Sequence, residues 1–174
     1  ASDREQKTGF VRALVDAYDR PIWVKDAAGF LTYIAYDGPT GAITKQIVDV
    51  DTTQTTTFSN LPSGWSTPSG GGLHLTTSFE VDTLGRTTKK TYPNGRVDYI
   101  VYNDATFEVR VYPAWDSTSN APLLPITVTR EDKARGYTET LTMTATPTVS
   151  SGRPTGTETI SGLQTLTRSV VNAV

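Results

Sequence analysis

The stretch Asp82–Asp104, DTLGRTTKKTYPNGRVDYIVYND, contains two alternating runs separated by a turn. The runs are Thr87–Tyr92 and Arg96–Tyr102, and alternation of apolar and polar residues is typical of half-buried strands. Asn94 and Gly95 lie between them, and Asn-Gly at such a place predicts a type I′ turn, in which both residues have positive φ. We therefore predict that the two runs pair as an antiparallel hairpin.

Similar alternation recurs along the chain. Thr is the commonest residue, and with Tyr, Val and Ile it suits a pleated, half-buried surface. Segments rich in Gly and Pro, among them a loop at 60–72, separate the runs. Only Arg12–Tyr18 hints at a helix, and it is short. We predict an all-β, mostly antiparallel fold. The other alternating runs are Thr32–Asp37, Leu73–Val81, Phe107–Tyr112, Ile126–Arg130 and Tyr137–Thr146.

Length and charge exclude several classes of protein. A chain of 174 residues is long enough for one core, and we expect a single all-β unit over 1–174. The net charge of -2 with scattered basic residues argues against a nucleic-acid partner. No apolar run is long enough to span a bilayer, and there is no Cys for disulfides. The opening ASDREQKTGF has neither Met nor an apolar signal, so we expect a piece of a longer or processed chain.

The region 82–112 resembles the tyrosine-aspartate (YD) repeat of the Rhs family. In that repeat an Asp and a Gly-Arg precede a strand, a Gly turn follows, and tyrosines come before an Asp or Asn. The matching residues are Asp82, Gly85, Arg86, Gly95, Tyr99, Tyr102 and Asn103. A second copy near 26–46 has Phe30 in place of the Arg, and its matching residues are Asp26, Gly29, Tyr33, Tyr36, Asp37 and Gly41. A weaker third copy near 132–146 keeps Asp132, Arg135 and Gly136, and we expect Ala17–Gly29 to hold the end of an earlier copy.

The resemblance implies stacked antiparallel β-hairpins in an extended or spiralling repeat sheet. In the family such a strip forms a hollow shell around a toxin or other cargo, or a barrel in cell-surface adhesion proteins. A hairpin of this size cannot bury its own faces and must stack on its neighbours. The implied role is structural and non-catalytic, as a shell, stalk or fibre of an extracellular or cell-surface protein. The family's Asp-Pro-rich closing segment, associated with self-cleavage, has no counterpart here, which argues against autoproteolysis and toxin delivery.

Candidate catalytic and metal-binding residues each have a simpler explanation. His74 is the only His, and we expect it to be a strand residue with satisfied hydrogen bonds. Asp49 and Asp51 could hold Ca²⁺, yet the six to eight oxygen ligands that this ion needs are not visible nearby, and a solvated face is expected. The Gly-rich Ser69–Leu73 lacks the Gly-Lys-Ser and helix of a phosphate cradle and is expected to be a flexible loop.

Acidic residues are numerous enough to supply pairs for glycoside hydrolysis, but the sequence fixes no separation between them. The acids that could form such pairs are Asp82, Asp98, Asp104, Glu108 and Asp116. We therefore expect no catalytic residue, no cofactor and no metal.

Aromatic residues support an alternative function, a carbohydrate-binding or carbohydrate-active β-domain. Trp65 lies in the loop LPSGWSTPSGGG and Trp115 in YPAWDSTSNAP, and an exposed Trp can stack on a sugar face. Against this, Trp65 could fold back over the sheet as a lid. A sugar site gathers two or three aromatics on one patch, whereas the sequence spreads Trp23, Trp65 and Trp115 along the chain.

The closing run Gly162–Val174 is rich in Thr and Val, has a single charge at Arg168 and contains no Pro. Unpaired strand edges are templates for pairing unless charge, Pro or a cap blocks them. The run would pair with the next repeat, another copy or a donated strand, or else with its own neighbour Tyr137–Thr146. The first alternative predicts self-association.

Overall fold

The structure is a computed structural model that describes residues 4–8 and 11–170, with side chains from residue 12 onward. The described residues form β-strands and turns with no helix, and the strands pair as antiparallel hairpins, which confirms the predicted fold class. Where the sequence suggested one unit, the chain divides into two compact units, residues 1–86 and 87–174.

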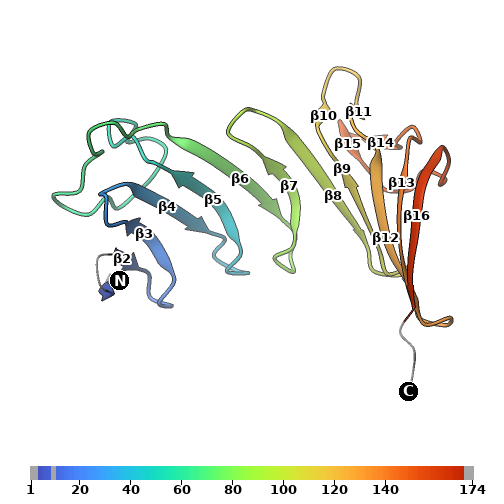
Figure 1. The fold of residues 1–174 in the computed structure, drawn as a ribbon, viewed down its shortest axis with the longest axis horizontal. Helices are drawn as coiled ribbons and strands as arrows, with labels where there is room; N and C mark the ends of the chain where they lie inside the picture. Colours follow the sequence, from blue (N-terminus) through green and yellow to red (C-terminus); the bar gives the residue numbers. More distant parts are fainter. Residues whose placement is uncertain (1–3, 9–10, 171–174) are drawn as a thin grey trace. The chain divides into compact units, whose positions relative to one another are not determined.

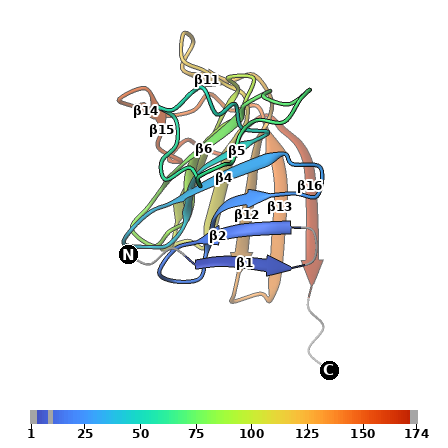
Figure 2. The same cartoon turned by 90° about the vertical axis from the view of Figure 1, so that its left-hand side faces the viewer.

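In the first unit each strand pairs antiparallel with its neighbours in sequence. The strands are β1 (Arg4–Thr8), β2 (Val11–Val15), β3 (Pro21–Lys25), β4 (Leu31–Tyr36), β5 (Ile43–Val48) and β6 (Leu75–Val81), and Figures 1 and 2 show them from two directions (Figure 1; Figure 2). Arg12–Tyr18, the one hint of a helix, belongs to β2 and the turn after it, because β2 pairs with strands on both sides.

The core of the first unit lies on one face of this sheet. Trp23, Tyr33 and Ile47 occupy matching positions on β3, β4 and β5, and all three are buried. The long segment between β5 and β6 covers that face: Phe58 packs edge-on against Trp23, with ring centroids 5.2 Å apart. The indole Nε1 of Trp23 donates to the carbonyl of Ser59 at 2.9 Å. The segment is therefore a cover for the core as well as a connection.

The second unit has the same plan, with strands in the order β7-β8-β9-β12-β13-β16. These are β7 (Thr87–Thr91), β8 (Val97–Asn103), β9 (Glu108–Tyr112), β12 (Ile126–Asp132), β13 (Tyr137–Met143) and β16 (Leu163–Val170). Two small ribbons lie in the connections, β10 (Trp115–Asp116) with β11 (Ala121–Pro122) and β14 (Val149–Ser150) with β15 (Arg153–Pro154).

The core of the second unit also lies on one sheet face, under those connections. Tyr112, Ile126 and Met143 are buried on β9, β12 and β13. Trp115 of the β10–β11 ribbon packs edge-on against Tyr112, with ring centroids 6.1 Å apart. Both units thus bury one face of a sheet beneath a long connection.

The strands β7 and β8 pair as a hairpin, as predicted, but the turn differs from the expected type. Lys89 lies opposite Tyr99, whereas a two-residue loop at Asn94 and Gly95 would place Lys90 there. Gly95 has φ of 81°, as predicted, whereas Asn94 is not among the residues with positive φ. The Gly95 N–H donates to the Tyr92 carbonyl at 2.9 Å, and the Tyr92 N–H donates to the Arg96 carbonyl at 2.8 Å. This is a three-residue loop, a type I turn followed by a left-handed Gly. A two-residue loop would need an N–H from residue 93, which is Pro.

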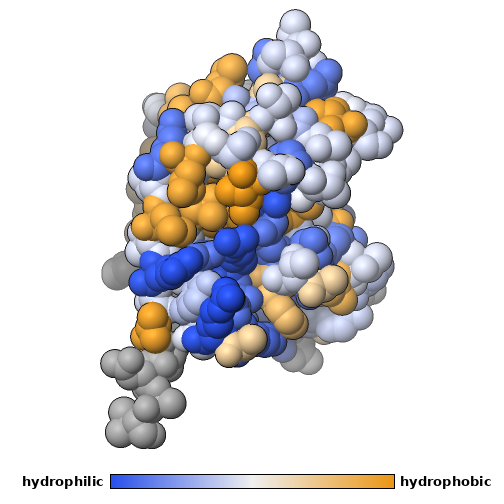
Figure 3. Space-filling model, turned by 90° about the vertical axis from the view of Figure 1, so that its right-hand side faces the viewer, coloured by the Kyte–Doolittle hydropathy of each residue, from blue (hydrophilic) through white to orange (hydrophobic). Residues whose placement is uncertain are grey.

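The closing run forms β16, which pairs antiparallel along β13, so it lies beside its own neighbour. Residues 171–174 of that run are outside the described residues. All eight side chains of β16 are exposed, including Leu163, Leu166 and Val170. Figure 3 views the molecule from this side and shows hydrophobic groups gathered above a band of hydrophilic ones (Figure 3).

Candidate functional site

The motif residues of the repeat build turns. At the end of the first unit, Asp82 Oδ1 accepts from the backbone N–H groups of Leu84 and Arg86, both at 2.9 Å. Its Oδ2 accepts from Arg86 Nε at 2.7 Å. Gly85 stands in the left-handed position of the turn, with φ of 79°. Burial opposes the charge of this carboxylate, but hydrogen bonds from Arg86 outweigh it and lower the pKa of Asp82.

The same turn occurs 66 positions earlier in the chain, around Asp16. Asp16 Oδ1 accepts from the N–H groups of Tyr18 and Arg20, and Oδ2 accepts from Arg20 Nε at 2.8 Å. Asp19 takes the left-handed position with φ of 59°. Asp16–Arg20 therefore matches the Asp82–Arg86 turn. The segment Ala17–Gly29, which we expected to hold the end of an earlier copy, belongs instead to the start of the first copy of the module.

The offset of 66 continues through the rest of the module. The next turn is at Asp26–Phe30 in the first unit and Tyr92–Arg96 in the second, and both have the same pair of backbone hydrogen bonds. Gly29, with φ of 94°, corresponds to Gly95. Asp26 Oδ1 accepts from the Phe30 N–H at 2.8 Å, so the turn persists although Phe30 replaces Arg. In register, then, Asp26 corresponds to Tyr92 and not to Asp82.

The tyrosines of the motif pack within the module. Tyr33 is buried beside Trp23, and Tyr99, its counterpart, packs edge-on against Trp115. The Tyr36 hydroxyl donates to the carbonyl of Pro21 at 3.0 Å, and burial raises the pKa of this phenol. Tyr102 occupies the matching place on β8. These rings serve packing and local hydrogen bonding.

The loop that closes the module is built on Asp37 or Asn103. Asp37 Oδ2 accepts from the backbone N–H and the hydroxyl of Thr40, which lowers the pKa of Asp37. Gly41 has φ of 73°, and its counterpart in the second unit is Phe107, with φ of 51°. The backbone of Phe107 is therefore left-handed although its side chain is bulky, and this side chain is 49% exposed.

The weaker third copy is a related loop. Both the Arg135 and the Gly136 N–H groups donate to the Asp132 carbonyl, at 3.3 and 2.9 Å. The guanidinium of Arg135 lies 3.3 Å from Asp132 Oδ2. This loop joins β12 to β13. Its motif residues therefore belong to a closing loop and not to an opening turn, which explains why their order is altered.

The residues considered for metal binding or catalysis anchor the segment between β5 and β6. Asp49, 8% exposed, accepts from the N–H groups of Gly72 and Leu73 at 2.8 and 3.0 Å. Asp51 accepts from Thr53. His74 Nδ1 accepts from the Asp51 N–H, and Nε2 lies 3.1 Å from the Thr57 hydroxyl. The described residues hold no group of three or more His, Cys, Asp or Glu arranged to bind a metal ion.

Both loop tryptophans lie against their cores. Trp65 is half-buried beside the Trp23 cluster, with Lys25 Nζ 5.8 Å from its ring centroid. Trp115 is 8% exposed, and its Nε1 is buried without a hydrogen-bond partner among the described residues. Burial leaves Trp115 no open face for a sugar, whereas Trp65 keeps part of its surface exposed.

The remaining acids fall into different surroundings. Asp98 is buried and accepts from Tyr92, Arg96 and the Ala114 N–H; burial opposes its charge, but these hydrogen bonds outweigh it and lower its pKa. Asp116 caps its own exposed turn, and Asp104 is exposed. Glu108 alone lines a substantial groove.

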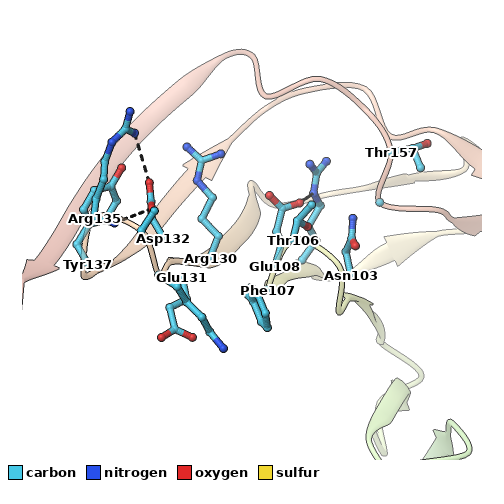
Figure 4. A pocket seen from close by; sticks show the side chains of 14 residues that line it. Asn103, Thr106, Phe107, Glu108, Arg130, Glu131, Asp132, Arg135, Tyr137 and Thr157 are labelled. Carbon is cyan, nitrogen blue, oxygen red and sulfur yellow. Dashed lines mark hydrogen bonds and ion pairs between the residues drawn. The ribbon is translucent and has the colours of Figure 1, made fainter.

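That groove, with a volume of about 790 Å³, lies in the second unit where the strands meet the 103–107 and 132–136 loops (Figure 4). Its floor is a row of polar residues on adjacent strands: Asn103 pairs in register with Glu108, and Glu108 with Arg130. Figure 4 shows these three side chains on one side of the ribbon, with Phe107 and Glu131 pointing to the other. We call this row and its rim the polar groove.

A buried ionic cluster supports the polar groove from beneath. Arg110, 7% exposed, donates to Glu108 Oε1 and to Glu158 Oε1, both at 2.6 Å. The Tyr112 hydroxyl also donates to Glu158 Oε1 at 2.6 Å. Burial opposes the charge of Glu158, but these hydrogen bonds outweigh it and lower its pKa; burial and the nearby carboxylate raise the pKa of Tyr112. The cluster ties the connection between β13 and β16 to the sheet.

A second ionic cluster spans three strands. Glu139, 1% exposed on β13, accepts from Arg130 Nε on β12 at 2.7 Å and from Arg168 Nε on β16 at 2.6 Å. These two hydrogen bonds lower the pKa of Glu139, with Arg168 the larger cause.

Sequence reasoning singled out Glu108 but not Arg110, Arg130, Glu139 or Glu158. Alternation places Glu108 and Arg110 on one face of β9, a signal that was available. Nothing in the sequence around Glu158 indicates that it reaches a residue 48 positions away.

The part of the chain that the structure describes contains no helix long and apolar enough to cross a membrane. Comparison with models of known protein families and with curated proteins finds no match for this chain.

Proposed function

We propose that this chain is a non-catalytic structural segment, of the YD-repeat kind, from the shell, stalk or fibre of an extracellular or cell-surface protein. One observation supports this best: the chain contains the same module of two tight turns and a closing loop twice, with counterparts 66 positions apart. Repeated hairpin modules that bury one sheet face are typical of extended scaffolds.

The motif residues favour a structural role because their polar atoms are used within the module. Asp16 and Asp82 each hold the backbone of one turn and the guanidinium at its end. Tyr33 and Tyr99 pack against tryptophans. A residue whose hydrogen bonds all close a turn has little left for a substrate.

The reading frame on either side of this segment tests the scaffold role. We expect further modules with the spacing of Asp16, Gly29, Tyr33 and Tyr36. Flanking sequence with no such module would contradict the proposal.

Self-association through sheet edges is the second part of the proposal. β16 has β13 on one side, its side chains are exposed, and it carries one charge. Light scattering over a concentration series should show growing mass for the intact chain and less for a chain ending at Gly162. If the intact chain is a monomer at every concentration, assembly through this edge is ruled out. The scaffold role would then be tested by the reading frame alone.

A further inference from the structure

The polar groove holds guanidinium groups with hydrogen-bonding capacity to spare. Arg130 uses only Nε on Glu139, and both of its Nη atoms lack a partner among the described residues. Arg110 uses Nε and Nη1, which leaves Nη2. The exposed side chain of Arg135 lies at the rim, where it contacts Asp132 at 3.3 Å and hydrogen-bonds to Tyr137. Guanidinium N–H pairs recognise carboxylates in a planar, bidentate manner.

The groove also holds acceptors next to these donors. Glu108 and Glu158 share the single cation Arg110, and Glu108 Oε2 has no partner among the described residues. Glu139 is shared by two arginines, so Arg130 is only partly neutralised. Because Glu108 and Arg130 are in register on adjacent strands, the floor places the Oε2 acceptor of Glu108 near the Nη donors of Arg130.

We propose that the polar groove binds an acidic oligosaccharide of the uronic acid type. The ligand's carboxylate lies on Arg130, with Arg110 Nη2 beneath it, and its hydroxyl groups donate to Glu108 and exchange hydrogen bonds with Asn103 and Thr157. Such a ligand offers donors, acceptors and one negative charge per sugar, which is the combination that the groove requires. The volume of about 790 Å³ suits a short oligosaccharide.

Other anionic ligands fit less well. A polyphosphate carries acceptors and almost no donors, so Glu108 and Asp132 would repel it. Arginine clusters also recognise acidic peptide motifs. The ionised side chains of such a peptide are acceptors only, so they offer Glu108 no donor, whereas sugar hydroxyl groups do. The groove floor is a set of paired strands lined by polar groups. Binding at the groove does not depend on the scaffold role.

The test is isothermal titration calorimetry of the full chain with a short oligogalacturonate at low ionic strength. We expect a Kd below about 1 mM. Arg130→Gln should weaken binding by roughly tenfold, because it removes the guanidinium and keeps a donor for Glu139. The fully methyl-esterified oligogalacturonate, which has the same sugar ring without the charge, should bind at least about tenfold more weakly.

Lys25→Gln is the matched control variant. It removes one positive charge from the first unit, outside the groove, where Lys25 Nζ lies 5.8 Å from the ring centroid of Trp65. We expect its Kd to stay within about twofold of the wild type. If Arg130→Gln does not fold by circular dichroism, Arg135→Gln at the exposed rim replaces it, with a smaller loss expected.

Four outcomes would overturn the proposal. They are no heat of binding up to millimolar oligogalacturonate, equal binding of the ester, equal weakening by Lys25→Gln, and equal binding of a glutamate-rich peptide. The last result would assign the groove to acidic peptides, and the third would show attraction by overall charge alone.

Discussion

At the scale of single residues, backbone conformation and buried charge carry most of the specificity in this chain. Gly95 must be left-handed for its turn, and Glu158 must be ionised to hold Arg110 and Tyr112. Few other residues could take the place of either one, and the role of each can be tested by one substitution.

Replacing Gly95 with Ala should lower the free energy of unfolding by about 1 kcal/mol, because L-residues are strained at φ of 81°. An added Cβ at Gly95 would meet nothing within 4 Å, so the loss comes from the backbone alone. Gly38 is the control: its Cβ would also meet open space, and its φ lies outside the left-handed region. Urea denaturation of both variants measures the effect, and an equal loss in the two would contradict the explanation.

Replacing Glu158 with Gln should destabilise the protein by about 2 kcal/mol at pH 7, because it leaves buried donors poorly satisfied. The pKa of Glu158 is lowered in the folded protein, so its contribution is present above its ordinary pKa of 4.5 and is lost as the pH falls through the folded value. The gap between wild type and variant should therefore shrink below about pH 4. Denaturation at several pH values tests this, and a gap independent of pH would exclude an ionic role.

At the scale of elements, a module of two turns and a closing loop occurs twice in the chain. The module tolerates Phe30 in place of Arg and Phe107 in place of Gly, because backbone hydrogen bonds define each turn and side chains reinforce it. This explains why the repeat is visible in the sequence but diverged.

The contribution of side chains to the stability of each turn can be compared by replacing the Asp that begins the turn with Ala. Asp82 and Asp16 each hold two backbone N–H groups and an Arg, whereas Asp26 holds one N–H. We expect larger drops in melting temperature for Asp82→Ala and Asp16→Ala than for Asp26→Ala. Because the pKa values of Asp82 and Asp16 are lowered, the differences should narrow in acid, when the carboxylates are protonated. Equal drops in melting temperature for all three variants would show that the second N–H and the Arg contact of Asp82 and Asp16 add no stability.

At the scale of the whole molecule, two units each bury one sheet face under their own connections. In the first, Asp49 and His74 anchor the connection by hydrogen bonds to the backbone. In the second, Trp115 and Glu158 do so through a ring contact and an ionic cluster. The polar groove belongs to the second unit alone.

Chelator treatment should leave the stability of the chain unchanged. Both oxygens of Asp49 already accept backbone N–H groups, and Asp51 is engaged by Thr53, so these carboxylates are not arranged as ligands for Ca²⁺. Melting curves with EDTA and with added Ca²⁺ should coincide. A shift of several degrees would require a metal site and would contradict this assignment.

Local pattern alone was enough for the strands, for the pairing of Thr87–Tyr92 with Arg96–Tyr102 and for the left-handed Gly95, because alternation and turn residues act over a few positions. It was not enough for the turn type, where Pro93 lacks the N–H that a two-residue loop needs. The local pattern also did not indicate that Trp115 is buried, because its burial depends on Tyr99 and Tyr112 of the neighbouring strands. Local pattern did not indicate the polar groove, since Glu108 and Arg130 become neighbours only when β9 and β12 pair, and Glu158 reaches Arg110 from the connection between β13 and β16. Charges on one face of a sheet become neighbours through pairing, and pairing is a property of the tertiary structure.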